Sequence, residues 1–354
     1  MSDAAPSLRA FGQADGDLRD IAGRAIAFIG YGNQSRAQAL NLRDSLRAAS
    51  IDAPIIVSAL RDGTAEQAEA DGFSTRSVAD AAKAADVLFL LVPDEALPEI
   101  FAKDIAPHLN ANDALVFASG YNLAFELIDV PSRIDAVMLA PRMIGRGLRL
   151  RYERGEGFYS YVSVEQDASG RAWPLVLALA AGIGALRGGA LELSARQETV
   201  IDLYMEQGFG ALFGRLVFET LAAATEAGLP PEAMVLELYL SGEMAETMQA
   251  MADLGFVEQS RLHSLTSQYG GMTRSLRVDR DAIQAHLKQA LDEITSGAFA
   301  REWAAEQAAG HENFERLREL GRQHNPFTPV EQRLRALRAA QSRRQQGAVE
   351  EQEP

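Results

Sequence analysis

The stretch Ala25-Ile-Ala-Phe-Ile-Gly-Tyr-Gly-Asn-Gln-Ser35 decides the fold of this 354-residue chain. Its first five residues form a short apolar run, which is typical of a buried strand in a parallel sheet. Gly30 and Gly32 follow that run directly, and residues 36–45 have helical spacing. The sequence therefore predicts a strand, a tight turn and the start of a helix, in that order.

This order is the context in which a glycine-rich turn binds a dinucleotide. Gly30 permits the turn, and Gly32 lets the backbone approach a pyrophosphate at the helix N-terminus. Ser35 stands where the usual motif has its third glycine, and it is also small. We expect a nucleotide-binding site at this turn.

Strand and helix patterns alternate outward from this stretch. Strands are predicted at 54–60, 87–92, 115–118, 136–140, 159–164 and 188–193, and helices at 65–70, 78–85, 97–109 and 172–181. The alternation predicts an α/β Rossmann domain with a doubly wound sheet, and the helical spacing after 194 predicts an all-α domain. The predicted divisions are an N-terminal extension (1–20), the Rossmann domain (21–194), the helical domain (195–340) and a disordered, charged tail (341–354).

The composition limits the partners of the chain. Its 34 basic and 49 acidic residues give a net charge of −15, which disfavours nucleic acid. The absence of cysteine excludes disulfides and thiolate chemistry. We see no signal peptide and no apolar stretch of the roughly 20 residues that a membrane span needs. We expect a cytoplasmic protein that acts on a small molecule, without a membrane partner.

The end of the second predicted strand is expected to meet the ribose of the adenosine. Arg61 and Thr64 suit a 2′-phosphate, whereas Asp62 and Glu66 repel one and suit a free 2′-hydroxyl. These residues leave NADH and NADPH both open, and the two carboxylates favour NADH.

A pair of acidic residues, Asp202 and Glu206, lies four positions apart in the predicted helix that begins at Ala195. This spacing puts both carboxylates on one face, where they suit a single divalent cation. A solvated acidic face is the alternative. The helix has apolar residues on most sides, and buried like charges need a cation, so we favour a metal site.

Taken together, several segments resemble ketol-acid reductoisomerase, the acetohydroxyacid isomeroreductase of branched-chain amino-acid synthesis. The segments are Ile29–Gln34, Ala37–Ser45, Val92–Glu95, Asp104–Pro107, Gln166–Gly170, Asp202–Gln207 and Gln268–Gly270. The resemblance covers residues 17–338 and implies a class I enzyme, with a Rossmann domain followed by a knotted helical domain. Such enzymes bind two Mg²⁺ ions, migrate an alkyl group in a 2-hydroxy-2-acetyl acid, and reduce the resulting keto acid with NADPH.

The resemblance implies a role for individual residues. Asp202 and Glu206 match the first pair of metal ligands, Glu243 matches one member of the second pair, and Ser264 matches the residue that holds the substrate carboxylate. The predicted catalytic residues are Arg142, Ser119, Glu243 and Ser264. The predicted cofactor-binding residues are Gly30, Tyr31, Gly32, Asn33, Gln34, Ser35, Arg61, Thr64, Glu66, Pro93 and Asp94.

Four departures from the family pattern lie at its chemical centre. Tyr239 stands at the position of the other second-pair glutamate, and a neutral phenol is a poor ligand for Mg²⁺. Ser119 replaces the family's histidine, and Arg142 replaces its lysine. Met143-Ile-Gly-Arg146 follows in place of Gly-Pro-Gly-His. Ser119 and Arg142 both follow predicted strands, where ligands bind, although structural loop positions are the alternative.

These departures leave three functions open. The first is an NAD(P)H-dependent reductase of a carbonyl or imine, with isomerase activity reduced or lost. The second is a working ketol-acid reductoisomerase, and the third is a non-catalytic nucleotide-binding protein. We also expect one Mg²⁺ rather than two, and a homodimer at least, because the resemblance implies a site shared between subunits.

Overall fold

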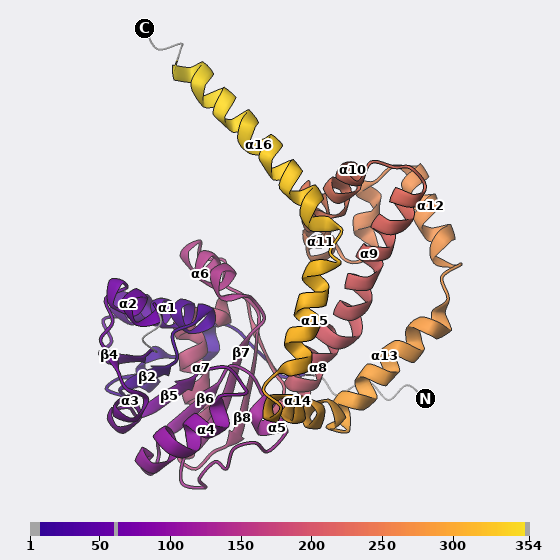
Figure 1. Cartoon of the computed structure of the whole chain (residues 1–354). Helices are drawn as coiled ribbons and strands as arrows, with labels where there is room; N and C mark the ends of the chain where they lie inside the picture. Colours follow the sequence, from indigo (N-terminus) through magenta and orange to yellow (C-terminus); the bar gives the residue numbers. More distant parts are fainter. Residues whose placement is uncertain (1–7, 60–62, 351–354) are drawn as a thin grey trace. The chain divides into compact units, whose positions relative to one another are not determined.

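The computed structural model describes residues 8–59 and 63–350 and divides the chain into two compact units, Met1–Asp202 and Leu203–Pro354. The division falls within helix α8 (Ala195–Tyr204). The first unit is α/β and the second is helical, as the sequence predicts (Figure 1).

A nine-stranded sheet forms the centre of the first unit, in the order β1-β9-β8-β7-β6-β5-β2-β3-β4. The strands are β1 (Ala10–Phe11), β2 (Ile26–Ile29), β3 (Ile55–Ser58), β4 (Thr75–Arg76), β5 (Val87–Leu90), β6 (Ala114–Phe117), β7 (Asp135–Pro141), β8 (Ser160–Gln166) and β9 (Ala190–Glu192). The strands from β7 to β4 run parallel, whereas β8 is antiparallel to β7 and β1 is antiparallel to β9. The strands β2, β5 and β6 are buried throughout, which explains why each is a continuous apolar run.

Helices cover both faces of the sheet. They are α1 (Asn33–Ala49), α2 (Thr64–Ala70), α3 (Val78–Ala84), α4 (Leu97–Ile100), α5 (Tyr121–Ala124), α6 (Gly145–Glu153) and α7 (Ala172–Ile183). Alternate strand residues face opposite cores. Phe28 and Phe89 stack 4.5 Å apart in the core under α1 and α7, and Ile29 and Leu90 face the core under α3 and α4.

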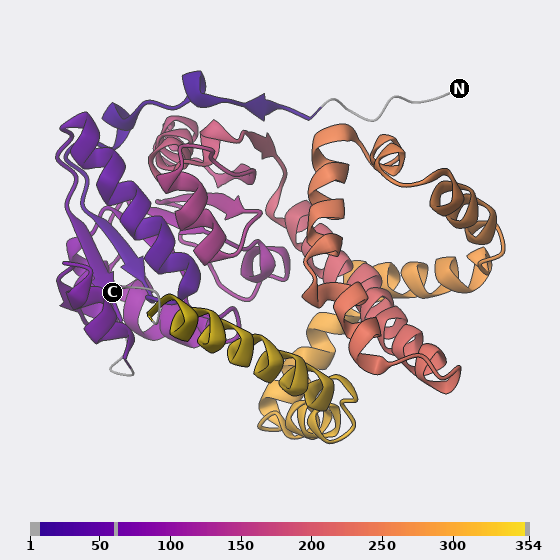
Figure 2. The same cartoon turned by 90° about the horizontal axis from the view of Figure 1, so that it is seen from above.

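The second unit is built of helices alone (Figure 2). They are α9 (Ala211–Glu226), α10 (Pro231–Val235), α11 (Glu243–Leu254), α12 (Leu265–Ser275), α13 (Arg280–Thr295), α14 (Ala298–Ala308), α15 (Glu312–Gln323) and α16 (Phe327–Glu350), with π-helical segments at Met205–Gly210 and Leu236–Leu240. Helix α16 runs into the segment 341–354, for which the sequence predicts disorder. Its Gln, Arg and Ala residues are strong helix formers, so a polar composition there does not oppose a helix.

Candidate active site

The glycine turn has the geometry that a dinucleotide needs. Gly30 has a φ of +92°, and a Cβ there would lie 2.7 Å from the carbonyl oxygen of Leu91, so only glycine fits. Gly32 caps α1, and a Cβ there would meet nothing within 4 Å, which leaves room for a pyrophosphate at the helix N-terminus. The buried Ser35 hydroxyl donates to the Gly30 carbonyl over 2.6 Å, so the serine closes the turn in place of the third glycine.

Two other residues of this segment have structural contacts. The buried Tyr31 ring packs against Phe73, and its hydroxyl donates to Asp71 over 3.0 Å. Gln34 donates from Nε2 to the carbonyl oxygen of Met143 over 2.7 Å, which ties the start of α1 to the loop after β7. The Tyr31 side chain therefore packs into the core, and only its backbone lies along the turn.

A hollow of about 450 Å³ lies beside the end of β3, where the sequence analysis expects the ribose of the adenosine. It is lined by Ala59, Ala65, Glu66, Glu69, Thr75, Arg76 and Ser77. Glu66 lies in the first turn of α2, two residues after Thr64. Arg61 lies outside the described residues. Glu69 and Arg76 are additional charged residues that the sequence analysis did not select.

A second group of polar residues gathers at the carboxyl ends of β5, β6 and β7. Asp94 follows β5, Ser119 follows β6, and Arg142 follows β7, so three neighbouring parallel strands place them together. The Ser119 hydroxyl donates to Asp94 Oδ2 over 3.3 Å, and Asn122 donates to Asp94 Oδ1 over 3.0 Å. The predicted residues Asp94 and Ser119 are therefore in direct contact.

Arg142 joins this group to helix α8. Its guanidinium donates to Glu198 Oε1 over 2.9 Å, and it also forms an ion pair with Asp202. The guanidinium carbon lies 5.0 Å from the ring centre of Tyr161. One arginine thus bridges two carboxylates that stand four residues apart on α8, a geometry that the planar fork of a guanidinium allows.

Glu198 is the most buried charged residue of this group, with 2% of its surface exposed. Its Oε2 accepts the backbone N–H of Gly120 over 2.8 Å. Burial, with a smaller contribution from nearby Asp202, raises the pKa of Glu198 to about 7, against the hydrogen bond from Gly120 and the positive charge of Arg142. Burial also raises the pKa of Asp94. The group therefore holds a carboxyl that can exchange a proton near neutral pH.

Comparisons with known proteins decide the family. Residues 20–189 match the domain described as "Acetohydroxy acid isomeroreductase, NADPH-binding domain", and residues 196–340 match "Ketol-acid reductoisomerase, C-terminal domain". The chain belongs to the ketol-acid reductoisomerase family. It is therefore an NAD(P)-dependent oxidoreductase, and this confirms the resemblance seen in the sequence.

Individual relatives agree with this result. A protein of this family from Saccharolobus solfataricus is 41% identical over 310 residues, which cover 86% of this chain and 91% of that one. The ketol-acid reductoisomerase (NADP(+)) of Leifsonia xyli is 38% identical over 330 residues, 92% of each chain. The structure of an NADH-preferring ketol-acid reductoisomerase from an uncultured archaeon superposes with a TM-score of 0.85 and 29% identity, covering 93% of this chain and 99% of that one.

The second unit contains Tyr239 and Glu243, the positions at which the sequence resemblance implies a second pair of metal ligands. Glu243 begins α11 directly after Gly242, whose φ of +92° ends the preceding helical segment. Tyr239 lies before that break, in the π-helical segment, and its hydroxyl donates to Glu331. Burial, with that contact, raises the pKa of Tyr239 to about 12. Its phenol therefore stays neutral at pH 7 and makes a poor ligand.

Two other predicted residues, Glu206 and Ser264, lie near the starts of helical segments. Glu206 lies in the first turn of the π-helical segment that follows α8, not in regular α-helix as predicted. Ser264 caps α12, where its hydroxyl oxygen accepts the backbone N–H of Ser267 over 3.2 Å. Within the described residues of one chain, no group of three or more His, Cys, Asp or Glu side chains could hold a metal ion.

Among the described helices, none is long and apolar enough to cross a membrane.

Glu198 is the site residue that the sequence analysis missed. Its position gives a signal, because Glu198, Asp202 and Glu206 repeat every four residues on one helix. Only the fold brings Glu198 to Gly120 and Arg142, which are 78 and 56 residues away in sequence.

Proposed function

We propose that this chain is a reductase of the ketol-acid reductoisomerase family in which alkyl migration is reduced or lost. The observation that carries the proposal is the bridge from Arg142 to Glu198 and Asp202. Asp202 matches a metal ligand of the family, and an arginine that neutralises it competes with a cation for the same carboxylate. Migration depends on metal polarisation of the substrate, whereas hydride transfer also proceeds beside a fixed positive charge.

The reduction uses groups that the chain already holds together. A bound dihydronicotinamide supplies the hydride that converts the substrate carbonyl into an alkoxide. Arg142 lies at the strand ends, where its positive charge stabilises that developing negative charge. With a pKa raised to about 7, Glu198 is protonated in part of the molecules at neutral pH, and in those it gives its proton to the alkoxide. Water returns a proton to Glu198 after the alcohol leaves.

For the metal, we propose one weakly held Mg²⁺ rather than two. Asp202 and Glu206 would hold it, with Glu243 of the partner subunit, and the ion would polarise the substrate carbonyl. The contact of Tyr239 with Glu331 supports the loss of the second ion, because the phenol is neutral and already hydrogen-bonded. The break at Gly242 supports it further, because Tyr239 and Glu243 do not share a continuous helix.

For the cofactor, we propose a preference for NADH. The carboxylates of Glu66 and Glu69 line the hollow beside the end of β3, and among its described lining residues Arg76 is the one cation. Two like charges facing a 2′-phosphate oppose NADPH and accept hydrogen bonds from a free 2′-hydroxyl. We expect a lower dissociation constant for NADH than for NADPH, measured by cofactor fluorescence. Glu66→Ser should narrow the difference, and tenfold tighter NADPH binding to the unaltered chain would defeat this preference.

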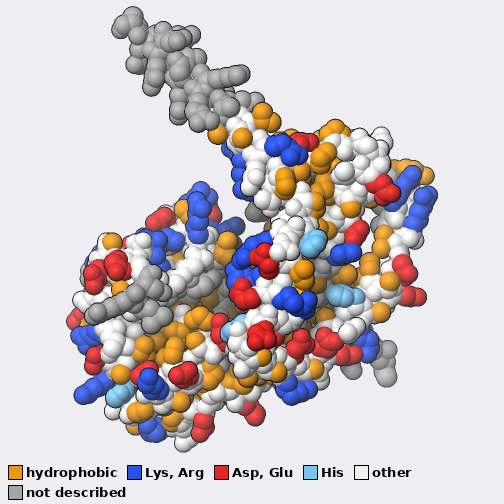
Figure 3. Space-filling model, viewed as in Figure 1, with side chains coloured by type: hydrophobic (Ala, Val, Ile, Leu, Met, Phe, Trp, Pro, Cys, Tyr) orange, Lys and Arg blue, Asp and Glu red, His pale blue; other side chains and the backbone are white. Residues whose placement is uncertain are grey.

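For the assembly, we propose a homodimer at least. The helical unit exposes many large apolar side chains, some of which are visible on the face in Figure 3. Several of them belong to the π-helical segment after α8 and to α9. Examples are Phe209 at 50%, Phe213 at 41% and Leu216 at 63% exposure. Its own core is small and centres on Leu221 and Val235. Surfaces of this kind normally face another protein, and a second copy is the partner that the family resemblance implies.

A working ketol-acid reductoisomerase is the second candidate, because both family domains match over nearly the full chain and Arg142 keeps the positive charge of the family's lysine. The two candidates are separated by assaying the protein with NADH or NADPH and Mg²⁺. We expect turnover of 3-hydroxy-3-methyl-2-oxobutanoate, or of another carbonyl or imine, and little or none of 2-acetolactate. Equal turnover of both acids would support the working isomeroreductase instead.

A further inference from the structure

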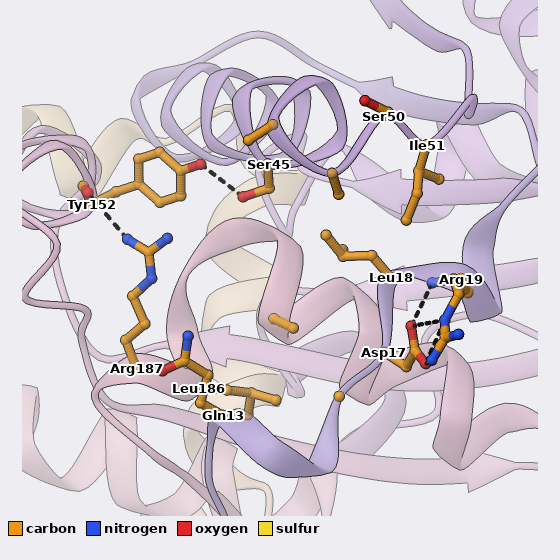
Figure 4. Close-up of a pocket in the computed structure, with 14 residues that line it drawn as sticks. Gln13, Asp17, Leu18, Arg19, Ser45, Ser50, Ile51, Tyr152, Leu186 and Arg187 are labelled. Atoms are coloured by element: carbon orange, nitrogen blue, oxygen red, sulfur yellow. Dashed lines mark hydrogen bonds and ion pairs between the residues drawn. The ribbon is translucent and has the colours of Figure 1, made fainter.

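A large hollow of the first unit lies away from the glycine turn, at the opposite end of α1. Its volume is about 820 Å³, within the range of small-molecule sites. It is lined by residues of the N-terminal segment, the end of α1, the end of α6, α7 and the turn after α7 (Figure 4). Among them, Leu18, Ile51 and Leu186 supply apolar surface.

One wall of the hollow is built around Tyr152. Its hydroxyl is 2.7 Å from the buried Ser45 hydroxyl, which fixes the position of the ring. The guanidinium of Arg187 lies 5.0 Å from the ring centre, and Arg187 donates to the Tyr152 carbonyl oxygen over 3.4 Å. Figure 4 shows the Arg187 side chain extending toward Tyr152 along this wall. A guanidinium and an aromatic ring are thus presented together.

The charge of Arg187 is not neutralised by the described part of the chain. No carboxylate among the described residues forms an ion pair with it, whereas Arg19, across the hollow, is paired with Asp17 through three side-chain hydrogen bonds of 2.5, 2.9 and 3.0 Å. The hollow therefore offers one unpaired cation beside an apolar surface. An anion with a compact apolar body complements both features.

The hollow is connected to the active site through two parallel helices. A Cβ on Gly145, at the start of α6, would lie 2.0 Å from the Asn33 carbonyl oxygen at the start of α1. Further along, Arg149 donates to Asn41 over 2.9 Å and to Asp44 over 2.7 Å. The first residues of α1 and α6 follow the glycine turn and the loop that holds Arg142. The last turns of the same helices contain Ser45 and Tyr152, which line the hollow.

We propose that this hollow binds a small carboxylate with a compact apolar body, through Arg187 and the Tyr152 wall, and that its occupancy alters cofactor binding at the other ends of α1 and α6. The binding part of the proposal does not depend on the proposed reductase function, because it is measured without turnover.

The test uses 4-methylpentanoate as the probe and isothermal titration of the full chain. We expect saturable binding, weakened tenfold or more for the neutral 4-methylpentanamide and by Arg187→Gln, because a charge-assisted hydrogen bond is lost in each. Arg187→Lys should retain part of the affinity. Arg47→Gln is the matched control, since Arg47 lies at the end of α1 but does not line this hollow, and it should leave the affinity unchanged.

Several results would overturn the binding site. They are equal affinity of the unaltered chain and Arg187→Gln, equal affinity for the amide, or no saturable binding of the carboxylate. Inorganic phosphate that binds as tightly as 4-methylpentanoate would contradict the role of the apolar surface. For the coupling, the dissociation constant of NADH is measured with and without saturating probe. We expect a change of at least about twofold, absent in Arg187→Gln, and an unchanged constant would contradict the coupling.

Discussion

At the scale of single residues, Arg142 is the departure from the family pattern on which the proposed function depends most. The family resemblance places a lysine there, which is a point charge with three donors. Arginine instead presents a planar fork, and here the fork contacts Glu198 and Asp202 at once. The bridge accounts for the weak metal site that we propose, and the arginine itself keeps the positive charge that we propose for reduction.

The first prediction follows from this bridge. Arg142→Lys should release one of the two carboxylates, because an ammonium cannot span both in the same geometry. Asp202 then becomes available to a cation, and we expect about tenfold tighter Mg²⁺ binding in isothermal titration with NADH present, equivalent to roughly 1.4 kcal/mol. Arg149→Lys is the matched control, because Arg149 lies on α6 and is also paired with a carboxylate, that of Asp44 on α1. Unchanged Mg²⁺ affinity in Arg142→Lys would count against the bridge as a competitor.

The second prediction concerns Glu198 and pH. Its pKa is raised from 4.5 to about 7 in the folded chain, so the folded state holds a proton that the unfolded state releases. The stability from this group is therefore fully present below pH 4.5 and is lost as the pH rises to about 7. The free energy of unfolding of the unaltered chain should therefore fall with rising pH, by on the order of 3 kcal/mol in full. Glu198→Gln should not show this fall when the free energy of unfolding is measured with urea between about pH 5 and pH 8.

A parallel pH dependence of stability in the unaltered chain and in Glu198→Gln would contradict this assignment. The same variant should lower the reduction rate at pH 7, because glutamine cannot give a proton to the alkoxide. In the unaltered chain, that rate should fall as the pH rises through about 7 and Glu198 loses its proton.

At the scale of elements, the sequence predicts most of the first unit because its central strands are continuous apolar runs. The strands β2, β5 and β6 lie within one residue or two of their predicted ranges. The two-residue strands β1 and β4 were not predicted, because edge pairing needs a neighbour that only the fold supplies. The π-helical segments were also missed, since apolar spacing does not separate π from α geometry.

The site, like the fold, could be predicted from the sequence only in part. Asp94, Ser119 and Arg142 could be predicted because parallel strands end at one edge of a sheet. The partner of Arg142 could not, because the contact with Glu198 joins residues 56 positions apart. The packing of Tyr31 into the core was equally hidden, since its motif position indicates only that its backbone borders the turn.

The third prediction tests the glycine turn with a matched pair of variants. Gly30→Ala should destabilise the chain by about 2 kcal/mol or more, because it combines a positive φ with a contact of 2.7 Å to the Leu91 carbonyl oxygen. Gly32→Ala should fold normally but bind NADH more weakly, since its methyl group occupies the space for the pyrophosphate. Urea unfolding and cofactor fluorescence measure the two effects. Equal stability of both variants would contradict the assigned roles.

At the scale of the whole molecule, the two units differ in how well they bury apolar surface. The first unit has two large cores, one on each face of its sheet, whereas the second has one small core around Leu221 and Val235. The fourth prediction is therefore a dimeric or larger mass by light scattering at micromolar concentration. Phe213→Asp should shift the chain toward monomer if its exposed ring lies in the subunit interface. A monomeric mass for the unaltered chain would rule out a site shared between subunits.

The central claim, that reduction is kept while alkyl migration is weakened, is tested most directly by one ratio. The rates of cofactor oxidation with 2-acetolactate and with 3-hydroxy-3-methyl-2-oxobutanoate are measured at saturating Mg²⁺, with NADH for this chain and with NADPH for the Leifsonia xyli ketol-acid reductoisomerase (NADP(+)) as the reference. We predict a ratio at least about tenfold lower for this chain than for that relative, which corresponds to about 1.4 kcal/mol at the migration step. Equal ratios for the two proteins would contradict the account.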